Sequence, residues 1–341
     1  MGEIGDESES IDIGGNDEMS SNSSENEVVS SGVSSIETVA ATPSIESVVG
    51  SNVENIAAPS NEIVIGTNEI SHGSNQNMQS PEITIGPLTI EQAQSVVESY
   101  HNQSISQIIA INGNYMSEAD RTRVLNGADS IRAVERGFNS AVTGGYNFDF
   151  SKGKSSIEVA VINQEQLERT TKHETNHFAS AHRETQVPDP NRDGYMVFQT
   201  VGTRQTSWFH SNLTEQDSGP ETKGHGLNEA LTTMYTNQQF AELDKDKAEA
   251  MAREDVYSHA LELCIQFENI VGEDALKEAY YGGDIKGLEA KVDSLAGEKE
   301  FEALMKCFDR AISDDYAVRI DAMKEAQDIL DKMYEEGGKE K

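Results

Sequence analysis

Basic residues are missing from the first part of this sequence. The first 100 residues hold 17 Asp and Glu but neither Lys nor Arg, and the first basic residue is Arg121. Of the 60 acidic residues in the chain, 43 remain in the other 241 positions, against 26 basic ones, and the formal net charge is −34. Because such a surface repels phosphate groups, we expect no nonspecific binding to nucleic acid or to anionic lipid.

Cysteine is scarce and long apolar runs are absent. Cys264 and Cys307 have no CxxC partner and lie in sequence of helical periodicity, so we expect buried thiols rather than a disulfide. The N-terminal residues contain neither the basic region nor the apolar run of a secretory signal peptide. No apolar run approaches the length of about 20 residues that spans a membrane. We therefore expect a cytoplasmic protein, or one exported without a cleaved signal.

Aromatic residues are absent from the first 86 positions, which consist mostly of Ser, Asn, Glu, Gly, Ile and Val. Short segments there repeat loosely, such as residues 35–39 and 44–48. A segment of this composition buries too little apolar surface to offset its ordering entropy. We expect residues 1–86 to be a disordered acidic arm that acts as a spacer, with addition of a strand to a partner's sheet as the alternative.

Regular periodicities begin at Leu88. Thr89 and Ser117 are suitable caps for two helices, the second over residues 117–138. Alternating residues predict strands over 156–162 and 194–201, followed by a polar loop over 207–226 and a helix from Leu227 past Tyr235. The periodicity of the last hundred residues predicts further helices over 244–271, 273–281, 285–296, 298–312 and 314–336. We therefore divide the folded part into 87–240 and a helical C-terminal subdomain, 241–341.

The central motif is His173-Glu174-Thr175-Asn176-His177, an HExxH pattern. Asn163 and Gln166 form a capping pair for a helix from Gln164 to about residue 181, directly after the strand expected over 156–162. Residues four apart lie on one face of a helix, so two histidines of this motif can hold one metal ion, with the glutamate beside it. The alternative is a pair of histidines on a solvated helix face.

Catalytic zinc requires a third protein ligand. The metzincin pattern would need Gly at position 180 and His at 183, where this chain has Ser180 and Arg183. The second known solution takes a glutamate from a later helix, and Asn228-Glu229-Ala230-Leu231-Thr232 supplies one. With both motifs the chain resembles the gluzincins, zinc metallopeptidases of thermolysin type, over residues 163–235. Residues 278–284 also resemble segments that follow such motifs in bacterial proteins.

The resemblance implies a zincin-like fold, one zinc ion held by His173, His177 and Glu229, and Glu174 as the general base. Asn228 would position the ligand helix. One departure concerns Thr233, where the family pattern has an acidic residue that orients a zinc-bound histidine. The donor to the oxyanion is expected at His225, with the other candidates at His210, Tyr195, Tyr280 and Tyr281.

These observations predict an α+β, mainly α, zincin-like domain with a helical C-terminal subdomain. The predicted function is zinc-dependent hydrolysis of peptide bonds in a peptide or protein substrate, by a metal-activated water. The alternative is a non-catalytic interaction or adaptor protein with a structural or vestigial metal site, favoured by Thr233 and by the polar pair Thr175 and Asn176 inside the motif. Both endopeptidase and exopeptidase activity remain open, and the sequence indicates no oligomeric state.

Overall fold

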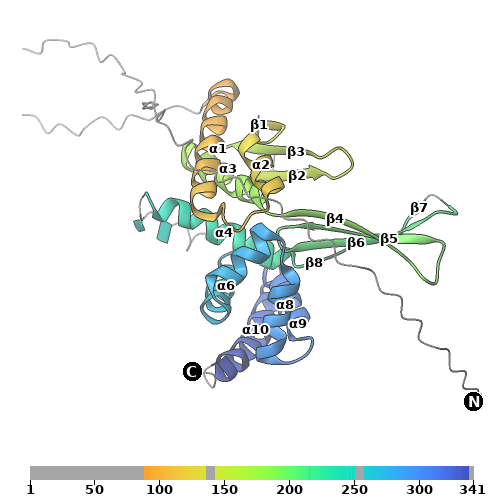
Figure 1. The fold of residues 1–341 in the computed structure, drawn as a ribbon. Coiled ribbons are helices and arrows are strands. Elements are labelled where there is room, and N and C mark those ends of the chain that lie inside the picture. Colours follow the sequence, from red (N-terminus) through yellow and green to blue (C-terminus); the bar gives the residue numbers. More distant parts are fainter. Residues whose placement is uncertain are drawn as a thin grey trace, which may run out of the picture. The chain divides into compact units, whose positions relative to one another are not determined.

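The computed structural model describes residues 88–135, 143–214, 216–243 and 257–337, together with 245, 246, 248 and 249. They belong to one compact unit, Ser80–Lys341. This unit combines helices with two β-sheets (Figure 1), which confirms the expected mainly helical α+β class. The disordered arm expected over 1–86 lies outside the described residues.

The first helix, α1 (Ile90–Asn112), begins where the sequence predicts it. Thr89 and Gln92 form a capping box, in which each side chain accepts a hydrogen bond from the backbone N–H of the other residue. The buried face of α1 includes Val97, Ile105 and Ile108. This face packs against the helix that carries the HExxH motif.

The second helix is shorter than the sequence predicts. α2 (Glu118–Asn126) is capped by Ser117, but the expected continuation to residue 138 is wrong. Gly127 ends the helix in a conformation with φ +76°, which favours glycine. The next segment forms strand β1 (Ser130–Glu135), because pairing with a distant strand overrides its helical periodicity.

A three-stranded sheet has the strand order β1-β3-β2. Its central strand, β3 (Lys154–Val161), confirms the strand expected over 156–162; it runs parallel to β1 and antiparallel to β2 (Gly144–Asp149). Helix α3 (Gln164–Ala179) packs against β2 and β3 and carries the HExxH motif. The outer strand β2 therefore lies directly beside the helix of the central motif.

A second sheet extends away from the helices as a narrow ribbon (Figure 1). Its main path is β4-β5-β6-β7, and β8 pairs with β6. The expected strand over 194–201 is confirmed, whereas the loop expected over 207–226 is wrong in part, because residues 207–211 pair with β5. The strands are β4 (His182–Pro188), β5 (Gly194–Val201), β6 (Arg204–Ser211), β7 (Gln216–Asp217) and β8 (Glu221–Lys223).

Helices make up most of the remainder of the described chain, and those after residue 272 lie close to the ranges that the sequence predicts. They are α4 (His225–Ala241), α6 (Ser258–Val271), α7 (Glu273–Lys277), the π-helical turn η1 (Glu278–Gly282), α8 (Ile285–Ala296), α9 (Glu300–Ala311) and α10 (Tyr316–Gly337). The helix expected over 244–271 is confirmed only over 258–271, and residues 244, 247 and 250–256 lie outside the described residues. One hydrophobic cluster joins residues from α1 to α10. The predicted domain boundary between 240 and 241 stays a prediction.

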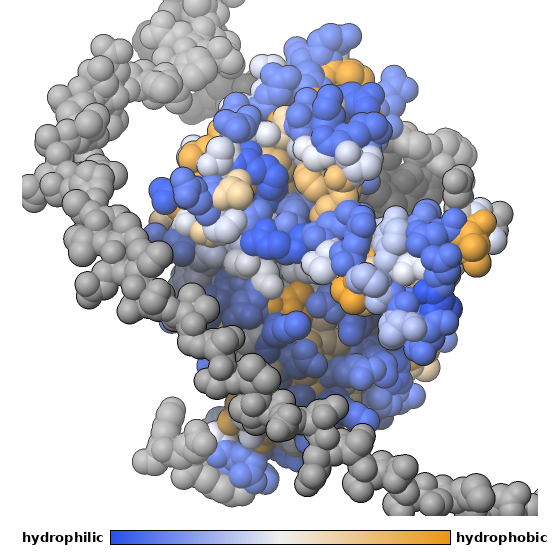
Figure 2. Space-filling model, turned by 45° about the vertical axis from the view of Figure 1, so that its right-hand side comes forward, coloured by the Kyte–Doolittle hydropathy of each residue, from blue (hydrophilic) through white to orange (hydrophobic). Residues whose placement is uncertain are grey.

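The core contains both cysteines as buried free thiols, in agreement with the sequence. In the described part of the chain, no helix is both long and apolar enough to cross a membrane. On the face drawn in Figure 2 the described surface is mostly hydrophilic, with scattered apolar residues.

Candidate metal centre

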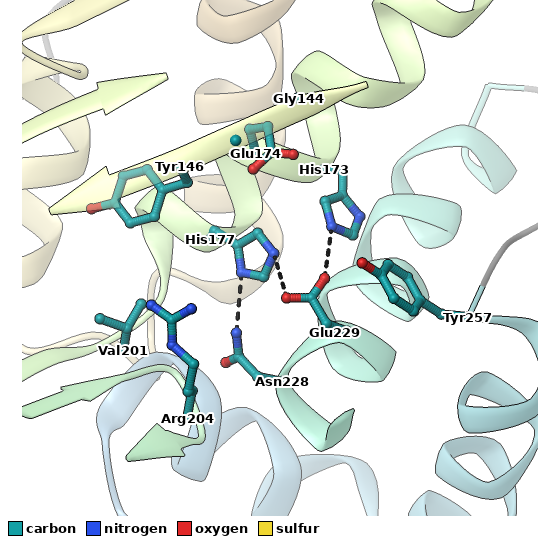
Figure 3. Close-up of a pocket in the computed structure, with 11 residues that line it drawn as sticks. Gly144, Tyr146, His173, Glu174, His177, Val201, Arg204, Asn228, Glu229 and Tyr257 are labelled. Atoms are coloured by element: carbon teal, nitrogen blue, oxygen red, sulfur yellow. Dashed lines mark hydrogen bonds and ion pairs between the residues drawn. The ribbon is translucent and has the colours of Figure 1, made fainter. Parts of the chain in front are cut away.

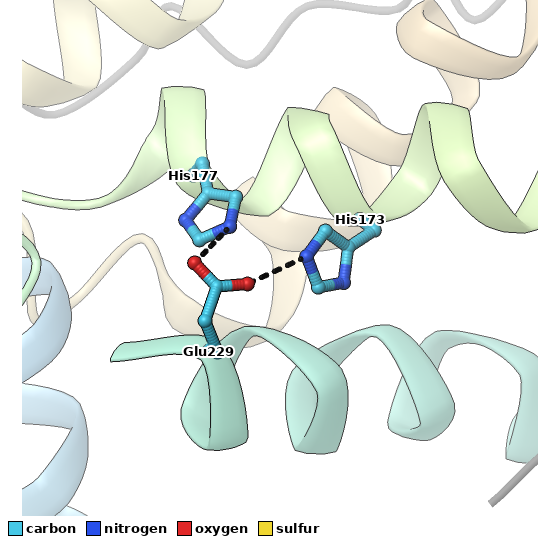
Figure 4. A group of neighbouring side chains, drawn as sticks. All are labelled: His173, His177 and Glu229. Carbon is cyan, nitrogen blue, oxygen red and sulfur yellow. Dashed lines mark hydrogen bonds and ion pairs between the residues drawn. The ribbon is translucent and has the colours of Figure 1, made fainter. Parts of the chain in front are cut away.

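Helix α3 supplies the two histidines of the candidate site. Asn163 caps the helix by accepting a hydrogen bond from the backbone N–H of Gln166 at 2.8 Å. His173 and His177 lie one turn apart on the face that meets α4 (Figure 4), and their rings form an edge-on contact. The local helix signals of the sequence thus present both imidazoles on one side.

Helix α4 supplies the third side chain, Glu229. No side chain of its own caps this helix. Instead, the carboxylate of Asp309 on α9 accepts hydrogen bonds from the backbone N–H groups of Gly224 and Gly226, at 2.9 and 2.7 Å. A Cβ at Gly226 would lie 1.9 Å from the carbonyl oxygen of Phe308, so glycine permits this close approach of α9. The C-terminal helices therefore fix the start of the helix that bears Glu229.

The three side chains converge between α3 and α4 (Figure 4). Nε2 of His173 lies 3.3 Å from one carboxylate oxygen of Glu229, and Nε2 of His177 lies 3.4 Å from the other. The candidate ligand atoms all lie within 4.8 Å of one another. Ligands bound tetrahedrally to zinc at about 2.0 to 2.2 Å stand about 3.3 to 3.6 Å apart. The donor set and the two nitrogen–oxygen spacings therefore fit a zinc ion.

Burial and charge act differently on the two glutamates of the site. Burial alone would raise the pKa of Glu229, but the charges and hydrogen bonds of His177 and His173 outweigh it and hold the pKa well below its ordinary value. Burial raises the pKa of Glu174, and the two histidines only partly offset this rise. Glu229 is thus held as a carboxylate, as a metal ligand must be.

Nδ1 of His177, the ring nitrogen that does not face Glu229, has two neighbours that favour opposite tautomers of the imidazole. Nδ2 of Asn228 lies 3.2 Å from Nδ1 of His177. The backbone N–H of Thr203 donates a hydrogen bond to Oδ1 of Asn228, which fixes the orientation of the amide. Oγ1 of Thr232 lies at the same distance of 3.2 Å and donates its own proton to the carbonyl of Asn228. Thr232 can therefore accept from a protonated Nδ1, and this tautomer leaves Nε2 free for a metal.

Thr233 does not replace the acidic residue of the family pattern. Its hydroxyl is buried and has no hydrogen-bond partner among the described residues. The side chain that reaches a histidine is that of the preceding residue, Thr232, and the histidine is His177. No sequence motif indicates this contact between Thr232 and His177, although Thr232 follows Glu229 by three residues and so shares its helix face.

Glu174 lies in the same cavity as the three candidate ligands (Figure 3). The start of β2 passes directly over it: a Cβ at Gly144 would lie 2.3 Å from Cγ2 of Thr170 and 2.9 Å from Oε1 of Glu174. A Cβ at Gly145 would meet no atom within 4 Å. The cavity measures about 200 Å³, which is room for a small part of a substrate.

Besides Val201, three larger side chains line this cavity and were not identified from the sequence. They are Tyr146 from β2, Arg204 from β6 and Tyr257, whose ring stacks on that of His173. The hydroxyl of Tyr146 lies 2.8 Å from Nε2 of His182. Nδ1 of His182 donates to a backbone carbonyl, so Nε2 accepts the proton of Tyr146. No motif marks these residues: strand pairing brings Tyr146 and Arg204 to the site, and Tyr257 lies at the start of α6.

The candidates for an oxyanion donor lie in different places. Nδ1 of His225 is 3.5 Å from Oε1 of Glu229, beside the ligand set but without a hydrogen bond among the described residues. The rings of Tyr195 and His210 contact each other on the second sheet, and His210 pairs with Asp217. Tyr280 and Tyr281 are fully buried in the core. His225 is therefore the one of these five that approaches Glu229 closely.

No model of a known protein family matches the chain, and the comparisons with curated proteins and with solved structures also give no match. Any functional conclusion therefore depends on the chemistry of this site.

Proposed function

We propose that this protein is a zinc-dependent metallopeptidase of gluzincin type, with a zincin-like arrangement of its metal-binding helices. One observation carries the proposal: the imidazoles of His173 and His177 and the carboxylate of Glu229 converge beside Glu174 in one cavity. The same donor set also binds iron in oxygenases. Glu174 favours hydrolysis, because a carboxylate next to the ligands is the group that hydrolysis requires as a base.

In this proposal His173, His177 and Glu229 hold the ion. A zinc ion there would polarise the scissile carbonyl and lower the pKa of a water molecule. Glu174 would be the general base that accepts a proton from the attacking water and delivers it to the leaving amine. His225 is the proposed donor to the oxyanion, supported by its position one turn before Glu229 on α4.

The edge of β2 is the proposed binding surface for an extended peptide. β3 pairs with one side of β2, and no other described strand pairs with its outer side. Gly144, Gly145 and Tyr146 of β2 also line the cavity of the candidate ligands. A peptide that adds to this edge by backbone hydrogen bonds would run past Glu174. This placement supports a peptide as the substrate.

Metal analysis of the purified protein tests the ligand set. We expect about one zinc per chain in the wild type and a loss of zinc in Glu229→Ala, with the fold retained by circular dichroism. Stoichiometric iron in place of zinc, or no bound metal after incubation with zinc, would contradict the proposal.

Cleavage of a broad peptide library tests the reaction. Glu174→Gln should keep the zinc and lose turnover, because Glu174 is a base and not a ligand. His225→Gln should also keep the zinc, with a turnover lowered roughly 100-fold, which is the usual size of a lost oxyanion donor. A zinc-loaded wild type that cleaves no peptide would instead favour the interaction or adaptor protein.

A further inference from the structure

The cavity of the candidate ligands adjoins a second cavity of about 170 Å³. Tyr146, Val201 and Arg204 line both of them. The second cavity lies between strand β2 and two cross-strand pairs of the ribbon, Val201 with Arg204 and Gln199 with Thr206. A group that occupies it would therefore belong to the same bound molecule as a group beside Glu174.

Arg204 is the one charged residue among those that line the second cavity. Its neighbours there are aromatic, aliphatic or neutral polar side chains, and the described lining includes no carboxylate. The chain as a whole has 60 acidic residues against 26 basic ones. The second cavity thus has a positively charged lining in a protein that is acidic as a whole. The electrostatic field of Arg204 in this cavity favours an anion.

The guanidinium of Arg204 is also without a protein partner in the described part of the chain. No hydrogen bond or ion pair of this side chain is found there, whereas Arg123, Arg183 and Arg192 are each paired with an aspartate. On strand β4 of the same sheet, the carboxylate of Glu184 accepts hydrogen bonds from Gln199 and Gln186. In Figure 3 the guanidinium of Arg204 points into the space beside Tyr146 and His177.

A guanidinium in this setting matches a carboxylate, which it can bind through two parallel hydrogen bonds. We propose that Arg204 binds a carboxylate of the substrate, so that the site selects peptides with an acidic group close to the scissile bond. The carboxylate is either the side chain of Asp or Glu or the C-terminal carboxylate of the peptide. This inference rests on the proposed peptidase function for its substrate, but it concerns binding and can be tested without turnover.

Binding to the Glu174→Gln protein loaded with zinc is the first measurement. The probes are fluorescent peptides in matched pairs that carry Glu or Gln at one position, and pairs that end in a carboxylate or an amide. We expect binding of the acidic member to be roughly 10 to 100 times tighter, the usual value of a charged hydrogen-bonded contact. The pair with the larger ratio identifies the source of the carboxylate.

A bound metal ion also attracts carboxylates, so the preference has to depend on Arg204. The Arg204→Gln variant should bind both members of each pair equally, and Arg204→Lys should retain part of the preference. Arg132→Gln is the control: it makes the same change of charge at an exposed arginine on β1, outside both cavities. It should leave the preference unchanged.

Three results would overturn the inference. They are equal binding of acidic and neutral peptides to Glu174→Gln, a preference that persists in Arg204→Gln, and a loss of the preference in Arg132→Gln as well.

Cleavage by the otherwise wild-type enzyme gives an independent readout: Arg204→Gln should raise KM for acidic peptides and leave kcat/KM for neutral ones unchanged. An equal fall in kcat for both would assign Arg204 to the reacting carbonyl instead. Absence of any cleavage together with selective binding would refute the peptidase and retain the carboxylate pocket.

Discussion

Oγ1 of Thr232 lies 3.2 Å from Nδ1 of His177, while Nε2 of the same ring faces Glu229 at 3.4 Å. Because Thr232 donates its proton to a backbone carbonyl, its oxygen can accept from Nδ1–H and so hold His177 in the tautomer that binds a metal. Asn228 favours the opposite tautomer, with Nε2 protonated toward Glu229. Binding of the proposed zinc ion would thus be coupled to the choice between two hydrogen bonds of one imidazole.

This relationship predicts that Thr232→Val weakens zinc binding. The substitution keeps the shape and removes the acceptor of Nδ1–H, and a lost partner of a metal ligand lowers affinity about 10 to 100-fold. Competition with a chromogenic chelator measures the affinity. Thr232→Ser, which keeps a hydroxyl, should restore most of it.

Thr233→Val is the matched control for that experiment. The hydroxyl of Thr233 is buried without a partner among the described residues, so its removal should leave zinc affinity unchanged. It should leave stability unchanged or raise it by about 1 kcal/mol. If Thr233→Val and not Thr232→Val weakened zinc binding, the assignment of the supporting residue would be refuted.

The close approach of β2 to α3 predicts that Gly144→Ala lowers activity. The new methyl group would meet Thr170 and the carboxylate of Glu174 at distances below 3 Å, so the strand or the glutamate has to move. We expect destabilisation of about 1 to 3 kcal/mol and a fall in turnover of at least about 10-fold, with zinc still bound. Peptide cleavage and thermal unfolding measure the two effects.

Gly145→Ala provides the comparison, since its added methyl group would meet no atom within 4 Å. Its stability and zinc content should stay near those of the wild type. Equal effects at both positions would show that the turn geometry of the strand, rather than the contact with Glu174, is responsible.

The cap at the start of α4 predicts that a residue far along the chain controls metal affinity. Asp309→Asn weakens the carboxylate hydrogen bonds to Gly224 and Gly226, and we expect a loss of about 1 to 2 kcal/mol in stability. Zinc affinity should fall as well, because Glu229 lies in the second turn of the same helix. Denaturant unfolding and chelator competition measure these changes. Asp328→Asn, an equal change of charge at an exposed position on α10, should have neither effect.

The parts of the fold that depend on local signals could be predicted from the sequence. Thr89 and Asn163 mark the starts of α1 and α3, and the hydrophobic periodicity locates most of the C-terminal helices to within a few residues. The three candidate ligands could also be predicted, because their spacing within two helices is a local sequence signal. What depends on pairing between distant segments was missed: β1 has helical periodicity, and β2 begins with two glycines.

The same distinction applies to the candidate site. His173, His177 and Glu229 were identified from motifs, and the structure brings their ligand atoms together. Arg204 and Tyr146 carry no local signal, because strand register alone directs them toward the cavity. The cap at Asp309 joins residues more than 80 positions apart. Such contacts arise only when the whole chain is folded, and no pattern within one helix or strand indicates them.

A buried histidine away from the metal centre makes stability sensitive to acid. The ring of His101 is buried against Phe178. Its Nε2 accepts a hydrogen bond from the backbone N–H of Ala128, and its Nδ1 lies 2.9 Å from the hydroxyl of Thr175. Burial lowers the pKa of His101 to about 4 from an ordinary value of 6.5. The folded state therefore keeps this ring neutral at pH values where the unfolded chain is protonated.

The sign of the effect follows from this difference in pKa. Above pH 6.5 the ring is neutral in both states, and its full contribution to stability is present. As the pH falls from 6.5 toward 4, the unfolded chain binds a proton that the folded protein does not, so stability is lost. The loss amounts to about 2 to 3 kcal/mol between pH 7.5 and 4.5.

His101→Gln removes this titration and should be less stable than the wild type at pH 7.5, because it loses packing and a hydrogen bond. The stability difference from the wild type should then shrink by about 2 to 3 kcal/mol on going to pH 4.5, since only the wild type loses this contribution. Urea unfolding at several pH values, with EDTA present to exclude metal release, measures the difference. A difference between His101→Gln and wild type that stays constant with pH would refute the assignment of the acid sensitivity to His101.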